Sequence, residues 1–199
     1  MTTSAPNAVT GDQGRVVARA SAAAFGATER PRVSRFRDED ERRHVDLLIC
    51  DGSPDDGLTS YSTVTLHETT NLVDGRDVRV EIAAVAPTEF PAFAHVLATA
   101  AFNVIKDAWL LAPDVVFPEA LADLGTPTSL RHLMFTAPFP FEDLGSVTVA
   151  DDLTVHWLLA VPISEAERIY ALEHGADGLN KLFEERNVVY YDPARTSIV

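Results

Sequence analysis

The stretch that decides the fold is LTVHWLLAVPISEAERIYALEHGADGLNKLF, residues 153–183. Its first part, 153–161, is apolar on both faces, which is typical of a strand in the interior of a sheet. Ser164 and Glu167 have the spacing of a capping box, in which each side chain binds the backbone N–H of the other residue at the start of a helix. Gly175 can end that helix and a second one can follow. The stretch therefore predicts a central strand and then a pair of C-terminal helices.

Upstream of this stretch, strands are predicted on both sides of one long helix. Residues 89–108 predict the helix, because apolar side chains recur there at i, i+3, i+4 and i+7. Apolar or alternating runs rich in β-branched residues predict strands at 44–50, 58–68, 77–85, 114–117 and 129–137. Strands outnumber helices, and the helices are segregated from them. This order predicts an α+β fold.

The composition of the chain changes near residue 43. Residues 1–43 hold eight arginines and six acids but few large apolar side chains. We therefore expect a flexible N-terminal leader over 1–43 and a folded domain over 44–199. The alternative is an ordered N-terminal helix that packs on the domain.

The charge of the chain disfavours several classes of partner. Sixteen basic and 30 acidic residues give a net charge of −14, of which the predicted domain carries −16. Nucleic acid and anionic lipid are poor partners for such a surface, because phosphates are bound through Lys and Arg. The sequence has no apolar stretch long enough to span a bilayer and no basic segment before an apolar run at its start. We therefore expect a cytoplasmic protein without a membrane segment.

Motifs for catalysis, metal binding and cofactor binding are missing from the sequence. The six histidines form no HExxH and no i, i+4 pair on a predicted helix, and one cysteine, Cys50, cannot build a thiolate metal site. GxSxG and the glycine-rich phosphate loops are absent too. We predict no catalytic residues, no metal and no cofactor. The alternative is a small hydrolase or metal-assisted enzyme, which requires His132 and His156 to converge in a pocket with a carboxylate.

Candidate partner-binding residues lie in the predicted loops. The loop 137–145, APFPFEDLG, places Phe139 and Phe141 between prolines, which hold the backbone extended. The two rings can form the lip of a peptide-binding groove, or they can fold back onto the core. Acidic pairs in the loops would attract a cationic partner, and they are Asp55 with Asp56, Glu142 with Asp143, and Asp151 with Asp152.

Residues 155–199 resemble the suppressor-of-fused (SUFU) family. The family pattern is an apolar strand ending in Val-Pro-Ile-Ser or Thr, a Glu on the next helix, a Gly break, a Leu-rich helix and a closing Asp-Pro-x-Arg. The matching residues are Val161, Pro162, Ile163, Ser164, Glu167, Gly175, Leu179, Leu182, Asp192, Pro193 and Arg195. Looser matches extend the resemblance over roughly 44–199. His67 and Glu68 depart from the pattern, because they stand where the family reads Gly.

The resemblance implies a single SUFU-like domain with a mixed, mostly antiparallel sheet, one long helix and a C-terminal helix pair. It also implies a non-enzymatic protein-binding domain, and bacterial relatives of this kind often resemble immunity proteins that neutralise toxins. The acidic charge adds the expectation of a basic protein partner, such as a toxin domain. A scaffold module without a tight partner is the remaining alternative.

Overall fold

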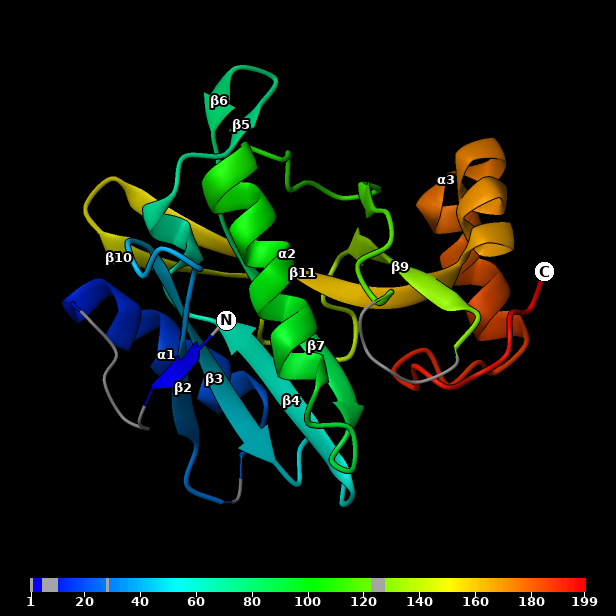
Figure 1. The fold of residues 1–199 in the computed structure, drawn as a ribbon, viewed down its shortest axis with the longest axis horizontal. Helices are drawn as coiled ribbons and strands as arrows, with labels where there is room; N and C mark the ends of the chain where they lie inside the picture. Colours follow the sequence, from blue (N-terminus) through cyan, green and yellow to red (C-terminus); the bar gives the residue numbers. More distant parts are fainter. Residues whose placement is uncertain (1, 5–10, 28, 123–127) are drawn as a thin grey trace.

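The computed structural model of the protein describes residues 2–4, 11–27, 29–122 and 128–199 (Figure 1). A mixed sheet of nine strands forms its centre. In spatial order the strands are β1 (Thr2–Ser4), β2 (Arg32–Arg37), β3 (His44–Asp51), β4 (Leu58–Thr63), β7 (Arg79–Pro87), β11 (Leu153–Ser164), β9 (Leu130–Thr136) and β8 (Val116–Phe117), and β10 (Ser146–Ala150) also pairs with β11. Only β7 and β11 pair in parallel among these described strands. The predicted α+β fold with a mixed, mostly antiparallel sheet is confirmed.

The helices in the described part of the chain pack on both faces of the sheet. α2 (Phe93–Asp107) covers the face to which β3 contributes its residues Val45, Leu47 and Ile49. α1 (Asp12–Ala24) and α3 (Glu165–Glu185) pack on the opposite face, to which β3 contributes Leu48 and Cys50. Neighbouring side chains of a strand point to opposite faces. β3 is therefore buried on both sides, and the sheet separates two hydrophobic cores.

The stretch 153–183 folds as its sequence predicts. β11 is buried without a break from Trp157 to Ser164. The capping box forms, because the Ser164 hydroxyl accepts from the N–H of Glu167 at 3.1 Å and the Glu167 carboxylate accepts from the N–H of Ser164 at 2.9 Å. Gly175 has a φ of 77°, which side chains rarely allow, and it divides α3 into two helical pieces. These pieces are the predicted helix pair.

The strand predicted over 58–68 is shorter in the structure. β4 ends at Thr63, and the chain then turns into the short 3₁₀ helix η1 (Leu66–Glu68). The fully buried carboxylate of Glu81 accepts from the N–H groups of Leu66 and His67, and it lies 2.6 Å from Nδ1 of His67. A hairpin of β5 (Leu72–Val73) and β6 (Arg76–Asp77) follows. A buried carboxylate thus ends β4 by binding the next backbone groups.

The expected flexible leader over 1–43 is not what the described residues show. α1 packs on the sheet with Val17 fully buried, and Phe25 is buried directly after it. β2 pairs with β3 over six residues. The buried carboxylate of Asp46 binds Arg35 through two hydrogen bonds of 2.7 and 2.8 Å, which ties β2 to the sheet. The described residues of β1, α1 and β2 therefore pack with the rest of the sheet, as in the alternative of an ordered N-terminal helix.

We expect Val17→Asp to lower the free energy of unfolding by at least about 2 kcal/mol, because it places an unpaired carboxylate in the core. Arg19→Asp changes an exposed residue of the same helix and should alter stability by no more than about 0.5 kcal/mol. Urea denaturation of the two variants measures the difference. Equal midpoints for Val17→Asp and the unmodified protein would show that α1 does not pack on the domain.

Candidate functional site

The loop after β9 places its two phenylalanines in different environments. Phe139 is 52 % exposed, whereas Phe141 is only 4 % exposed. The Phe141 ring lies 4.6 Å from the ring of Phe25, centroid to centroid, in the same core as α1 and α3. The prediction of Phe141 as a partner-binding residue is therefore wrong, because its ring is taken up by internal packing. Phe139 keeps the position of a lip residue.

Phe139 lines a groove of about 850 Å³. The groove lies between the end of β9 with its following loop and the second piece of α3 with the chain after it. Asn180 donates a hydrogen bond of 2.9 Å to the Thr136 hydroxyl and so joins the two sides. The residues that line the groove include Thr136, Phe139, Asn180, Phe183, Val188 and Tyr190. Its size falls in the range of about 300–1,000 Å³ that is usual for binding clefts.

Aromatic rings form one wall of this groove. The rings of Phe139 and Tyr190 meet edge to face at 4.9 Å, and Tyr190 meets Tyr191 at 5.2 Å. Burial, together with the smaller effects of the nearby Tyr191 and Asp55, raises the pKa of Tyr190 to about 12. The Tyr190 hydroxyl is therefore neutral at physiological pH, and Asp55 lies close enough to act on it. The wall offers large, partly dehydrated rings that can anchor a partner's side chain.

Two acidic side chains line the groove, and others are exposed on nearby loops. Asp177 and Glu184 line it, with Lys181 as the basic residue among the lining side chains. Glu142 and Asp143 are exposed on the loop that carries Phe139, and Asp55 and Asp56 are exposed on the loop between β3 and β4. This groove therefore combines an apolar wall with an excess of negative charge.

Asp151 and Asp152 lie elsewhere. They form the turn between β10 and β11, at the opposite end of β11 from α3 (Figure 1). Asp152 lines a separate hollow with Asp77 and His156. Of the six predicted acids, Glu142 and Asp143 therefore lie on the loop of Phe139, and Asp55 and Asp56 lie in its region. Asp151 and Asp152 lie at a distance from it.

The chain after α3 is held by one buried carboxylate. Glu167 is fully buried and binds Arg195 through two hydrogen bonds of 2.6 and 2.9 Å. The N–H of Ile198 donates to the same carboxylate at 3.1 Å. The Arg195 guanidinium also lies 4.9 Å from the ring centroid of Phe183, which lines the groove. Glu167 thus caps α3 and fixes the segment that carries Tyr190.

Sequence reasoning missed Tyr190 and Asn180. The pair Tyr190-Tyr191, directly before the Asp192-Pro193 turn, is the signal in the sequence that could have identified the aromatic wall. Asn180 gives no such signal, because a polar residue on a helix is usually solvated.

His132 and His156 do not converge. His132 is buried, its Nδ1 accepts from the N–H of Glu119 at 3.0 Å, and its Nε2 lies 3.0 Å from the Glu165 carboxylate. His132 pairs opposite Ile163 of β11, and His156 lies seven residues before Ile163 on that strand. This separation is roughly 23 Å at the rise of a strand. The pocket that the hydrolase alternative requires is absent from the part of the chain that the structure describes.

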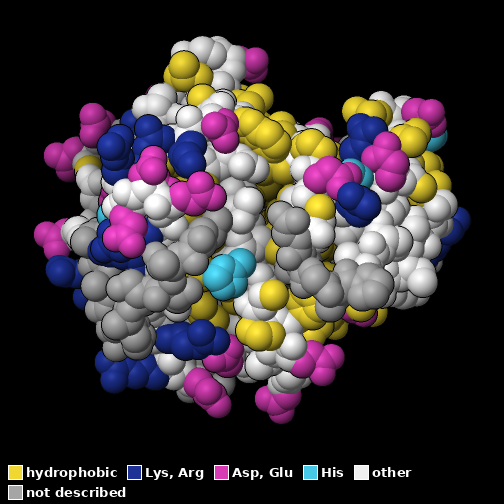
Figure 2. Space-filling model, viewed as in Figure 1, with side chains coloured by type: hydrophobic (Ala, Val, Ile, Leu, Met, Phe, Trp, Pro, Cys, Tyr) yellow, Lys and Arg dark blue, Asp and Glu magenta, His cyan; other side chains and the backbone are white. Residues whose placement is uncertain are grey.

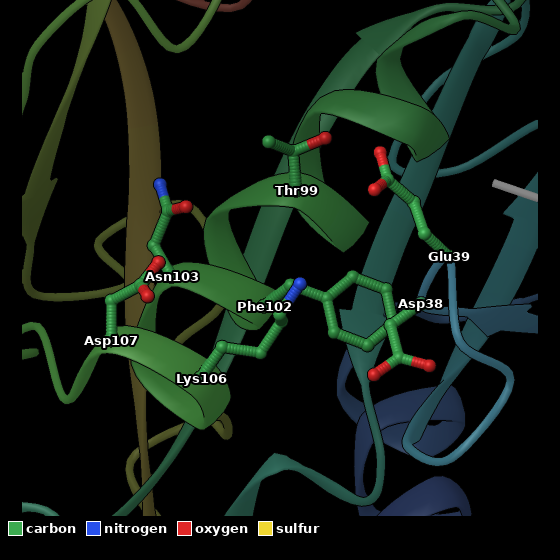
Figure 3. A pocket seen from close by; sticks show the side chains of 7 residues that line it. All are labelled: Asp38, Glu39, Thr99, Phe102, Asn103, Lys106 and Asp107. Carbon is green, nitrogen blue, oxygen red and sulfur yellow. The ribbon is translucent and has the colours of Figure 1, made fainter.

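A further hollow lies on the outer face of α2 (Figure 3). Asp38 and Glu39 face the helix there from the loop between β2 and β3. Its volume of about 190 Å³ is below the range of about 300–1,000 Å³ that is usual for ligand sites. The residues that line it are Asp38, Glu39, Thr99, Phe102, Asn103, Lys106 and Asp107. We therefore favour the groove beside Phe139.

The described residues contain neither a metal-binding cluster nor a membrane-spanning helix. No group of three or more His, Cys, Asp or Glu side chains is placed to hold a metal ion. No helix within the described ranges is both long enough and apolar enough to cross a membrane.

Comparisons with known proteins agree with one another. Residues 41–196 match the family model for suppressor of fused protein (SUFU). The immunity protein YqcF of Bacillus subtilis (strain 168) is 34% identical over 189 residues, which cover 94% of this chain and 97% of that protein.

Solved structures show the same fold. A putative SUFU homologue from Neisseria gonorrhoeae FA 1090 superimposes with a TM-score of 0.71 at 17% identity and covers 94% of this chain and 97% of its own. A chain of the Sufu–Fu complex superimposes with a TM-score of 0.68 at 13% identity, over 94% of this chain and 92% of its own. The family model covers most of the chain, and the relative from B. subtilis covers nearly all of it. The protein belongs to the suppressor-of-fused (SUFU) family.

Proposed function

We propose that this protein is an immunity protein that neutralises a toxin by binding to it through the groove lined by Phe139 and Tyr190. The observation that carries the proposal is 34% identity to an immunity protein over almost the whole of both chains. The groove supplies the surface, because it is preformed and carries exposed aromatic rings. Aromatic side chains in such sites often provide most of the binding energy of an interface. The protein acts in the cytoplasm in this proposal and requires neither a metal nor a cofactor.

The partner that fits this surface is a basic protein. The chain has a net charge of −14, and Asp177, Glu184 and Asp55 lie in or beside the groove. Opposite charges increase the rate of encounter and align the two proteins before the apolar contacts form. A toxin that attacks nucleic acid must be positive where it contacts phosphate. An acidic immunity protein can bind and cover that surface.

The test uses the product of the neighbouring gene as the candidate toxin. Cells that express the toxin should grow only when this protein is present, and the two purified proteins should form a complex in titration calorimetry. Phe139→Ala and Tyr190→Ala should each weaken binding at least ~10-fold, because each removes a ring from the wall. Leu172→Ala removes an exposed apolar side chain of α3 that does not line the groove, and it is the matched control with little expected change.

Two results would contradict the proposal. Protection of the cells without a complex would favour an enzymatic or indirect action. A complex that is insensitive to both ring substitutions would move the binding surface away from the groove. A scaffold module, the third possibility, predicts no tight complex with the toxin and no protection.

A further inference from the structure

An apolar patch lies apart from the groove, between the hairpin of β5 and β6 and the end of α2. We define the dimer patch by its three large side chains, Leu72, Trp109 and Leu110, which are 61 %, 36 % and 44 % exposed. Figure 2 shows apolar side chains gathered below the hairpin, where the chain leaves α2. Exposed side chains of this size cost solubility without stabilising the fold, so a cluster of them indicates an interface.

The dimer patch is held rigidly. The buried Asn71 amide donates to the carbonyl of Leu111 at 2.8 Å, and its oxygen accepts from the N–H of Leu111 at 3.0 Å. These two bonds tie the chain next to Leu72 to the chain next to Leu110. The Trp109 ring meets Phe117 edge to face at 4.8 Å. A partner therefore loses little free energy to ordering when it binds here.

Charges of both signs surround the dimer patch. Arg76 and Asp74 are exposed on the hairpin, and Lys106 and Asp107 are exposed at the end of α2. None of these four forms an ion pair or a side-chain hydrogen bond with another residue in the described part of the chain. Asp114 is a further exposed acid on the following segment. This mixture differs from the loops beside the groove, where the exposed charges are acidic.

We propose that the dimer patch is the contact face of a homodimer. Two copies of a chain with a net charge of −14 repel each other over most of their surfaces. A twofold axis through the dimer patch would bury the apolar side chains of both copies and place Arg76 and Lys106 of one copy against acids of the other. A purely basic partner would form no ion pairs with Arg76 and Lys106. The mixed rim therefore favours a second copy of this chain as the occupant.

Sedimentation velocity at ~100 µM tests the proposal, because a complex with a micromolar dissociation constant is almost fully formed at that concentration. A species of twice the chain mass of 21.6 kDa is expected. Leu72→Asp and Leu110→Asp should each raise the dimer dissociation constant at least ~10-fold, because each would bury an unpaired carboxylate. Leu172→Asp, at an exposed site on α3, should leave the dimer intact. A monomer at this concentration, or equal sensitivity to all three substitutions, overturns the proposal.

A charge exchange tests the arrangement of the two copies. The variant Arg76→Glu/Lys106→Glu has an acidic rim, and Asp74→Lys/Asp107→Lys has a basic one. Each variant alone should be monomeric, and an equimolar mixture should form a heterodimer. A mixture that does not associate overturns the proposal. Self-association does not depend on the toxin, so a failure of toxin binding would leave these results unchanged.

Discussion

Trp157→Ala is expected to lower the free energy of unfolding by about 3–5 kcal/mol, a large part of the stability of an ordinary domain. Trp157 lies buried in β11, the strand that pairs with β7, β9 and β10. Its indole N–H donates to the Ser62 hydroxyl of β4 at 3.0 Å, and Ser21 of α1 donates to the same hydroxyl at 3.0 Å. The substitution would thus remove a large apolar volume and one of the two hydrogen bonds that link β11 and α1 through Ser62 of β4.

Equilibrium denaturation in urea measures this effect. Trp157→Phe keeps most of the ring but loses the N–H donor, so it should cost about 1–2 kcal/mol. The difference between the two variants separates the packing contribution from the hydrogen bond. An unchanged midpoint for Trp157→Ala would contradict the central position of β11.

Glu167→Gln is expected to destabilise the protein by about 3–5 kcal/mol, because it leaves the buried guanidinium of Arg195 without its counter-charge. Asp12→Asn is the matched control, since Asp12 pairs with Arg15 in the first turn of α1 and both side chains are exposed. Loss of an exposed pair should cost no more than about 1 kcal/mol. Thermal or urea unfolding gives both values, and similar losses would contradict the role of Glu167 as a buried anchor.

Glu167→Gln also tests whether the ion pair with Arg195 positions the aromatic wall of the groove. Glu167 holds the segment that follows Tyr190, and burial is the main cause of the raised pKa of Tyr190. When that segment loosens in Glu167→Gln, the pKa of Tyr190 should fall from about 12 towards its ordinary value of about 10. Absorbance titration of the folded protein between these pH values detects the change. An unaltered titration would show that the ion pair does not position the aromatic wall.

The part of the fold that could be predicted from sequence is the part that local patterns determine. The strand and helix pair over 153–183 follow from an apolar run, a capping box and a glycine, which are all short-range signals. α1 gave a weak signal because it is rich in Ala and Ser, whose small side chains let a helix pack closely without an obvious apolar stripe. β2 has the sequence RVSRFR, which offers only Val33 and Phe36 as large apolar side chains and so gave little sign of a buried strand. The buried Asp46 that binds Arg35 lies on another strand and could not be assigned to it from sequence.

The candidate site could be predicted only in part. Phe139 and the acids of its loop are local features, and the prediction placed them correctly on an exposed loop. Phe141 of the same loop is buried instead, because its ring packs against Phe25, which lies more than one hundred residues earlier in the chain. The groove itself joins the end of β9 to α3 and Tyr190, and Asp55, more than one hundred residues earlier in the chain, lies close enough to raise the pKa of Tyr190. Such combinations follow from the tertiary fold and leave no pattern in any single segment.

Binding of the toxin through the groove is tested by the dissociation constant of the complex, determined by calorimetry from about 0.05 M to about 0.5 M salt. The comparison includes Phe139→Ala and the double variant Asp55→Asn/Asp56→Asn. Our account predicts that salt weakens the complex, that the double variant shows a smaller salt dependence, and that Phe139→Ala weakens binding at every salt concentration. A complex whose affinity is independent of salt and unchanged in all these variants would contradict it.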